Sequence, residues 1–205
     1  LREPDGRIVS AGEFLSLAEL AGFMNEIDRW VMEDTLRTLR DKPYISLTIN
    51  VSGHAFNDED LIGWLLDELA KLGSDAARLG LELTETAVIH DLNMARKAID
   101  RLRRASVRVL LDDFGAGFNS FAYLRHLQVD GIKIDGGLVR DLRGNHRHRA
   151  MVQAITLLAD AFGLLTVAEG IEDAATASIL KDLGITCGQG YYFGRPQDEF
   201  QLLTG

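Results

Sequence analysis

The sequence predicts an α/β fold in which parallel strands form a barrel covered by helices. Three observations lead to this prediction. Short apolar segments alternate with helical ones, each strand candidate ends in a polar or charged group, and no Gly-x-Gly-x-x-Gly motif follows the first strand. A doubly wound open sheet shares the alternation and stays an alternative. The last two observations favour the barrel, which builds its site at the C-terminal ends of its strands.

The strand candidates have the near-continuous apolar, β-branched character of buried parallel strands. They are residues 45–51, 79–85, 107–113, 131–135, 164–169 and 185–190. A closed barrel of this type normally has more strands than these. We therefore expect the N-terminal strand to be missing or incomplete.

Helices are predicted between the strands from apolar residues at helical spacing. The stripes run over Phe14–Ala21, Leu61–Leu72, Ala95–Leu102 and Met151–Phe162. Asp91 is placed to cap the third of these helices, and Asp173 to cap a last one that ends at Leu183. Glycines at 73, 163 and 184 follow helical stretches, where a left-handed residue ends a helix.

Composition limits the classes of function. The 205 residues suit one domain, and 46% hydrophobic residues exclude a disordered chain. With 22 Lys and Arg against 31 Asp and Glu, the net charge is −9, which disfavours a DNA or RNA polymer as partner. An acidic site can still bind a phosphate ester when metal cations stand between them.

The single cysteine, Cys187, excludes a disulfide framework and a thiolate zinc site. It lies in the last predicted strand, where we expect it to be buried. No apolar stretch reaches the ~20 residues that a membrane-spanning helix needs. These features predict a cytoplasmic domain.

Polar residues at the ends of the predicted strands are the candidate site: Asn50, Glu82, Asp112, Asp113, Lys133, Glu169 and Gln189. Glu82 interrupts an apolar run, where a buried carboxylate needs a cation or a hydrogen-bonding partner. The adjacent acids Asp112 and Asp113 repel each other unless positive charge lies between them.

Carboxylate and amide oxygens are hard ligands, which select Mg²⁺, Mn²⁺ or Ca²⁺ over zinc. Several carboxylates at one barrel mouth can hold two divalent ions ~3.5–4 Å apart, the arrangement that cleaves phosphodiesters. Lys133 stands between Ile132 and Ile134. It either orients an attacking water and offsets phosphate charge, or simply pairs with a carboxylate inside the barrel.

Six motifs in this order resemble those of the EAL domain family, the cyclic di-GMP phosphodiesterases and receptors of bacterial signalling. They are Asn50–Ser52, Glu82–Glu85, Asp112–Gly117, Lys133–Asp135, Ala168–Glu172 and Gln189–Tyr191. The resemblance implies a TIM-like barrel and one domain over residues 1–205, excised from a longer signalling protein. It further implies sensory or cyclase domains in that parent, a parent that can be anchored in a membrane, and a homodimer.

The resemblance also implies a role for each matching residue. The implied metal ligands are Asn50, Glu82, Asp112, Asp113 and Glu169, with Asp112 bridging the two ions. Lys133 contacts the attacking water and is grouped with Glu82 and Glu169 as catalytic. The residues implied to bind substrate or line the site are Gln189, Glu172 and Asp135. Glu85 is implied to brace the loop that follows Asp113.

The implied reaction is the hydrolysis of cyclic di-GMP to linear pGpG with two Mg²⁺ or Mn²⁺ ions, which Ca²⁺ inhibits. The alternative is a degenerate domain that binds the nucleotide without cleaving it. The Glu that begins the family's naming motif falls before the stretch matching Leu1-Arg2. In addition, Ala116 and Phe118 replace the usual Thr and Tyr of the loop after Asp113.

Overall fold

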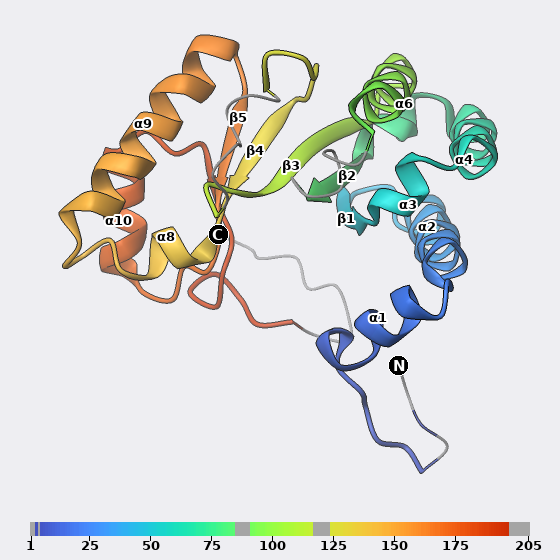
Figure 1. The fold of residues 1–205 in the computed structure, drawn as a ribbon, viewed down its shortest axis with the longest axis horizontal. Helices are drawn as coiled ribbons and strands as arrows, with labels where there is room; N and C mark the ends of the chain where they lie inside the picture. The colour runs from blue at the N-terminus through green and yellow to red at the C-terminus, as the bar shows by residue number, and fades with distance from the viewer. Residues whose placement is uncertain (1–2, 4, 85–90, 117–123, 197–205) are drawn as a thin grey trace. The chain divides into compact units, whose positions relative to one another are not determined.

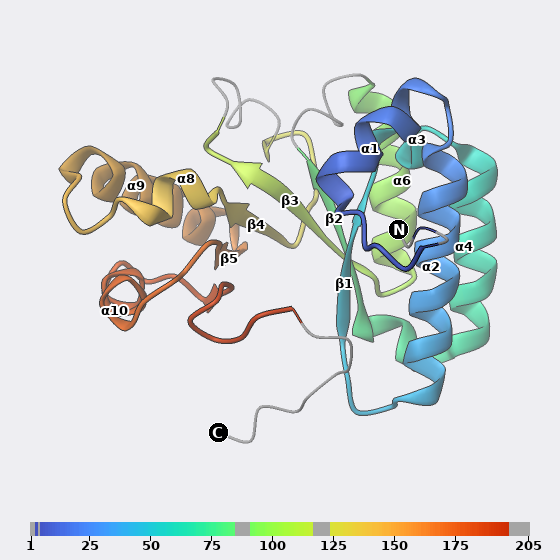
Figure 2. The same cartoon turned by 90° about the horizontal axis from the view of Figure 1, so that it is seen from below.

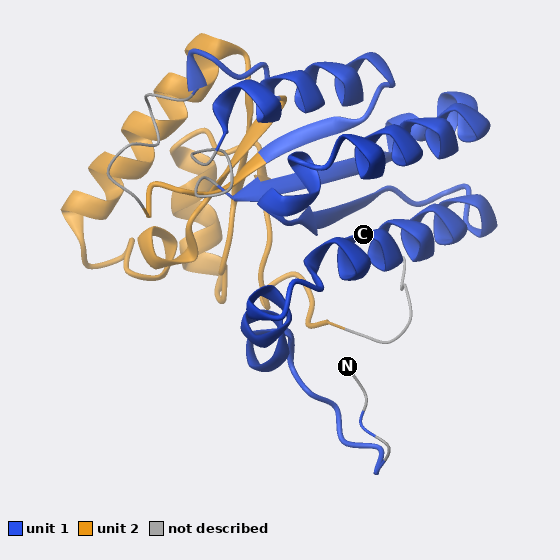
Figure 3. Ribbon diagram, turned by 45° about the vertical axis from the view of Figure 1, so that its right-hand side comes forward, with its two compact units in different colours: residues 1–110, 121–129 blue, residues 111–120, 130–205 orange. Residues whose placement is uncertain are grey.

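The structure, a computed structural model, describes residues 3, 5–84, 91–116 and 124–196. The chain divides into two compact units, coloured separately in Figure 3. Unit 1 comprises Leu1–Leu110 and Phe121–Val129, and unit 2 comprises Leu111–Ser120 and Asp130–Gly205. Strand β3 (Arg108–Phe114) runs across the boundary between them. In the described residues, the hydrogen-bonded strands follow chain order from β1 to β6.

Unit 1 builds two parallel strands and covers them with helices. Strands β1 (Leu47–Val51) and β2 (Leu79–Thr84) pair with Leu47 opposite Leu79 and Asn50 opposite Glu82. Three long helices run beside these strands in Figure 2: α2 (Met24–Asp41), α4 (Glu59–Leu72) and α6 (Leu92–Arg104). Two shorter helices belong to the same unit: α1 (Ala11–Leu20) and α3 (Gly53–Phe56).

The core of unit 1 follows the predicted apolar stripes of α4 and α6. On α4, Leu61, Leu65 and Leu69 are buried. The stripe of α6 is buried as well, at Ala95, Ile99 and Leu102. Asp91 accepts hydrogen bonds from the first turn of α6, which confirms the predicted cap.

Unit 2 repeats the alternation of strand and helix. Its strands β4 (Gly131–Ile134), β5 (Leu165–Ala168) and β6 (Cys187–Gly188) are parallel. Helix α9 (His146–Phe162) packs on β4 and β5, as Figure 1 shows. The described part of the unit also contains helices α8 (Gly136–Arg140) and α10 (Ala174–Asp182). Asp173 caps α10, as predicted.

The sequence analysis misses α2, the longest helix among the described residues. Its buried positions mix apolar side chains with Asp28 and Thr35, so the apolar stripe is broken. No helix in the described ranges is both long and apolar enough to cross a membrane.

Burial differs from the prediction at several positions. Cys187 is exposed, so the expectation of a buried cysteine is wrong. Helix α9 buries Val152 and Ile155, whereas Met151 and Phe162, at the ends of the predicted stripe, are 44% and 51% exposed. The buried face of α9 therefore has the predicted helical period, but it is centred closer to Val152 than the predicted stripe.

Arg78 holds the end of α2 and the segment that leads from it to β1. It closes the 3₁₀ helix Gly73–Arg78, and its guanidinium donates to the carbonyls of Leu39, Lys42 and Ile45 at 2.6, 3.0 and 2.9 Å. Its side chain is 15% exposed. Because the last carbonyls of a helix lack partners within the helix, Arg78 supplies a donor to one of them, Leu39 O, and to two carbonyls of the segment that follows.

Replacing Arg78 with alanine is expected to lower the free energy of unfolding by ~2–4 kcal/mol, since it removes three charge-assisted hydrogen bonds. Urea denaturation of the Arg78→Ala variant measures this loss. The control is Arg37→Ala, which breaks an exposed ion pair with Asp34 and should cost less than ~1 kcal/mol. Equal losses in the two variants would contradict the role given to Arg78.

Candidate metal centre

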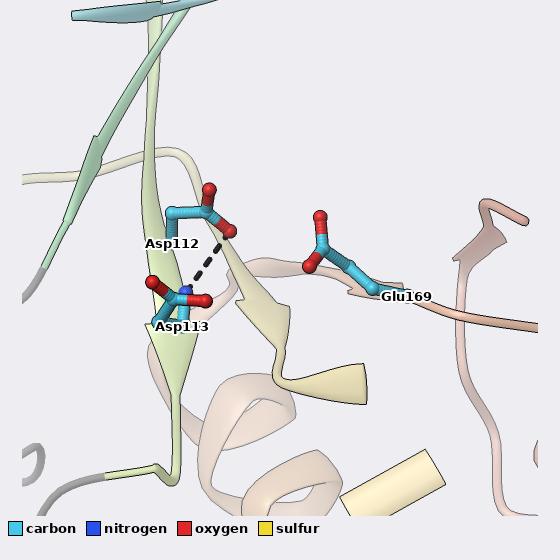
Figure 4. A group of neighbouring side chains, drawn as sticks. All are labelled: Asp112, Asp113 and Glu169. Atoms are coloured by element: carbon cyan, nitrogen blue, oxygen red, sulfur yellow. Dashed lines mark hydrogen bonds between the residues drawn. The ribbon is translucent and has the colours of Figure 1, made fainter. Parts of the chain in front are cut away.

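Three carboxylates of unit 2 converge on one point. Asp112 and Asp113 come from β3, and Glu169 directly follows β5. One oxygen from each lies within 4.8 Å of the others. Figure 4 shows Glu169 facing the two aspartates. Carboxylate oxygens at this spacing form a hard ligand set of the kind that holds Mg²⁺ or Mn²⁺.

The backbone at Asp113 explains how neighbouring residues share one site. Successive side chains of a regular strand point to opposite faces. Asp113 has φ 56°, a left-handed value that is uncommon outside glycine and interrupts this alternation. Its N–H donates to Asp112 Oδ1 at 2.9 Å, and its carbonyl accepts from Ala116 N at 3.2 Å. The end of the strand is therefore distorted at Asp113, and the carboxylates of both residues reach one site.

Lys133 supplies the positive charge at this cluster. Its side chain is 3% exposed, and its Nζ lies 2.5 Å from Glu169 Oε1 and 3.3 Å from Asp112 Oδ1. The backbone of Glu169 is fixed beside it, because Glu169 N donates to Ile134 O at 3.2 Å. Lys133 is thus a buried counter-charge to Asp112 and Glu169.

The electrostatics of the cluster favour a cation. Burial raises the pKa of the Asp113 carboxyl, the charges of Asp112 and Asp135 raise it further, and Lys133 opposes them. The ionised form of Asp113 is therefore disfavoured, and a bound cation would stabilise it. The residues present fit a divalent ion by the chemistry of their donor atoms and by their excess of negative charge.

Replacing Asp113 with asparagine is expected to stabilise the metal-free protein. Because the folded-state pKa of Asp113 is raised, its ionisation costs stability above the unfolded value of ~4, and this cost disappears as the pH falls through that value. Asparagine also tolerates the left-handed backbone. We expect the unfolding midpoint at pH 7 to rise by only ~1–2 °C, since Asp113 is only partly shielded and solvent still screens its charge.

Thermal unfolding of Asp113→Asn in metal-free buffer at pH 7 and near pH 4 measures this effect. The difference from the wild type should shrink at the lower pH. Added Mn²⁺ should raise the midpoint of the wild type more than that of the variant. A lower midpoint for the variant at pH 7 would contradict the assigned repulsion.

Asn50 and Glu82 form a second pair, in unit 1. They stand opposite each other on β1 and β2, so their side chains point to the same face of the sheet. Glu82 is 9% exposed, as expected for a carboxylate within an apolar run, and Asn50 is exposed. The pair offers one carboxylate and one amide oxygen at the C-terminal ends of adjacent strands.

The other predicted site residues lie in loops and at a cap. Asp135 caps α8 by accepting a hydrogen bond from Gly137 N at 2.8 Å, and its negative charge raises the pKa of Asp113. Glu172 and Gln189 are exposed. The backbone of Gln189 donates to Ala168 O at 2.8 Å and accepts from Ile171 N at 3.1 Å, which ties its loop to the end of β5. Glu85 lies outside the described residues.

Two features near the candidate ligands escape the sequence analysis. Asp28 is a buried acid of α2 that binds Ser52, two residues after Asn50. Gly190, beside Gln189, lies against the backbone of Ile171. A polar residue on the buried face of a helix is a signal that could have drawn attention to Asp28. For Gly190, the contact with Ile171 is set by tertiary structure and leaves no local signal.

Comparison with known proteins gives a consistent result. A family model described as the EAL domain matches residues 1–196. Cyclic di-GMP phosphodiesterase PdeB of Shewanella oneidensis is 33% identical over 201 residues, which cover 96% of this chain and 24% of that protein. The chain spans between 24% and 32% of the length of eight curated relatives that it matches.

Solved structures agree with this match. The PaMucR phosphodiesterase in complex with c-di-GMP is 30% identical with a TM-score of 0.87, covering 96% of this chain and 81% of that one. The FimX EAL domain of Pseudomonas aeruginosa bound to c-di-GMP is 28% identical with a TM-score of 0.89, at the same coverages. Their TIM-like barrel fold confirms the fold class predicted from the sequence.

Proposed function

Because the chain belongs to the EAL domain family, we propose that it hydrolyses cyclic di-GMP to linear pGpG with two divalent cations. The observation that carries the proposal is the convergence of Asp112, Asp113 and Glu169 around Lys133. A relative named as a cyclic di-GMP phosphodiesterase and a phosphodiesterase solved with c-di-GMP support it.

The cations in this proposal are Mg²⁺ or Mn²⁺. Asp112, Asp113 and Glu169 would hold them, and the family resemblance adds Asn50 and Glu82 to the ligands. When bound, such ions supply positive charge to the phosphodiester and lower the pKa of a water molecule. Ca²⁺ is proposed to inhibit, because its larger and more flexible coordination activates water less well.

The role proposed for Lys133 follows from its position. Its ammonium group is held between Asp112 and Glu169, so it has little freedom to move. In the proposed reaction it orients the attacking water and offsets the charge that develops on the phosphate. Asp135, Glu172 and Gln189 are proposed to line the nucleotide site, and Glu85 to brace the loop after Asp113.

The setting of this activity is also proposed. Because the chain covers about a quarter of the length of two curated relatives, YkoW and PdeB, we propose that it works as the cyclic di-GMP module of a longer signalling protein. Sensory or cyclase domains and self-association into a homodimer would belong to that whole protein.

A second candidate function is binding of cyclic di-GMP without hydrolysis. The observation that favours it is Ala116, which stands in the loop after Asp113 where the family usually has Thr. Loss of that hydroxyl removes a hydrogen-bonding group close to Asp113. A receptor of this kind would bind the nucleotide and pass the signal to a partner.

One assay separates the two candidates. The protein is incubated with cyclic di-GMP and Mn²⁺, and pGpG is measured by chromatography. The proposed function predicts steady formation of pGpG, and tight binding with no product would favour the receptor.

In the same assay, replacing Glu82 with glutamine is expected to lower kcat at least ~100-fold, because a neutral amide replaces a charged ligand oxygen of the same size. The thermal unfolding midpoint should change little. The control is Glu59→Gln, an exposed acid at the start of α4 in the same unit. Unchanged turnover in Glu82→Gln would remove Glu82 from the ligand set.

A further inference from the structure

A buried carboxylate outside the metal cluster has no role in the reaction proposed above. Asp28 lies on α2 and is 5% exposed, on the same buried helix face as Met32 and Leu36. An apolar side chain at such a position would pack without the desolvation cost of a carboxylate. The contacts of Asp28 therefore have to explain why an acid stands there.

Among the described residues, the hydrogen bonds of Asp28 come from Ser52. Asp28 Oδ2 lies 2.5 Å from Ser52 Oγ, and Asp28 Oδ1 lies 3.3 Å from Ser52 N. Burial raises the pKa of Asp28, while the two hydrogen bonds from Ser52 and the nearby charge of His54 oppose that rise. Both donors of Ser52, its hydroxyl and its backbone N–H, are thus directed at one carboxylate.

Ser52 is itself the junction between β1 and α3. Its Oγ accepts from Ala55 N at 3.3 Å and so caps α3 while the hydroxyl donates to Asp28. Ser52 also follows Val51, the last residue of β1, and lies two residues after Asn50. The backbone that leaves β1 is therefore fixed on one side by α2 and on the other by α3.

We propose that Asp28 is a positioning residue that, through Ser52, fixes the C-terminal end of β1 and thereby the side chain of Asn50. This inference rests on the proposed function, in which Asn50 is a metal ligand opposite Glu82. Asp28 touches neither nucleotide nor ion in this proposal. Its carboxylate determines where the strand ends, as residues behind metal ligands commonly do.

The test measures Mn²⁺ binding by calorimetry, with MnCl₂ and no nucleotide, on the 205-residue chain. Asp28→Ala and Ser52→Ala are each expected to weaken Mn²⁺ binding ~10-fold, the lower end of the loss seen when residues behind metal ligands are removed. The double variant should be no weaker than the single ones, because the two residues act as one unit. Ser52→Thr keeps the hydroxyl and should stay within ~3-fold of the wild type.

The matched control is Thr35→Val. Thr35 is a buried polar residue of the same helix, and its hydroxyl donates to Val31 O at 2.7 Å. This variant also removes a buried hydrogen bond of α2, so it should lower thermal stability but leave Mn²⁺ affinity within ~2-fold. A loss of Mn²⁺ affinity in Thr35→Val equal to that in Asp28→Ala would overturn the positioning role.

If Asp28→Ala does not fold, Ser52→Ala decides the question, because it removes the hydroxyl that donates to Asp28 at a half-buried position. A folded Ser52→Ala variant with unchanged Mn²⁺ affinity overturns the inference. Failure of the proposed function gives a different result from failure of this inference. A wild-type protein that binds Mn²⁺ but forms no pGpG contradicts the proposed hydrolysis and leaves the positioning role of Asp28 intact. A wild type that binds no Mn²⁺ contradicts both.

Discussion

Replacing Gly190 with alanine is expected to lower the free energy of unfolding by ~3 kcal/mol or more. A Cβ at this position would lie 2.2 Å from the carbonyl oxygen of Ile171 and 2.3 Å from its nitrogen. The backbone there has φ +155°, which side chains rarely adopt. The two segments cannot separate freely, because Ile171 N donates to Gln189 O and Tyr192 N donates to Ile171 O.

Thermal unfolding of Gly190→Ala measures this cost, with an expected fall in the midpoint of ~6–12 °C. Gly194→Ala is the matched control, since a Cβ there meets no atom within 4 Å. That control should change stability by no more than ~0.5 kcal/mol. A Gly190→Ala variant as stable as Gly194→Ala would show that the loop can move away from Ile171.

Replacing Lys133 with methionine is expected to lower kcat for cyclic di-GMP hydrolysis by ~100- to 1000-fold, because the proposed reaction loses its fixed positive charge. The metal-free protein should also lose ~3–5 kcal/mol, since Asp112 and Glu169 are left without their buried partner. Cations can take the place of that missing charge. Mn²⁺ should therefore raise the unfolding midpoint of Lys133→Met more than that of the wild type.

Lys181→Met is the control for this experiment. Lys181 is an exposed lysine in the last turn of α10 in the same unit. Its loss should leave both kcat and the response to Mn²⁺ near the wild-type values. Lys133→Met with full activity would reduce Lys133 to a structural ion-pair partner of the two acids.

Much of the fold could be predicted because its signals are local. An apolar run such as Leu79–Leu83 is buried along its whole length, so it is recognised as a strand without knowledge of its neighbours. Asp91 and Asp173 accept hydrogen bonds from the next few residues, which is also local information. Helix α2 was not predicted, because an acid interrupts its apolar face. That acid, Asp28, is buried against Ser52, which lies 24 residues further along the chain and cannot be identified locally.

The acids of the site could be predicted from one physical rule. The C-terminal ends of parallel strands lie at one edge, so polar groups there gather whatever their separation in sequence. Asp112 and Glu169 follow this rule, and the ion pairs of Lys133 with both confirm that they share surroundings. The turn at Asp113 and the contact of Gly190 with Ile171 were out of reach, because both depend on atoms placed by the folded chain.

The left-handed backbone at Asp113 restricts which residues evolution or an engineer can place there. Most residues pay a steric penalty in this conformation, and Asp and Asn are the usual exceptions after glycine. Of these, aspartate alone carries a negative charge. Replacing Asp113 with glutamate, ordinarily a mild change, would therefore increase backbone strain and also lengthen the side chain. The acids of this cluster thus differ in how well they tolerate substitution.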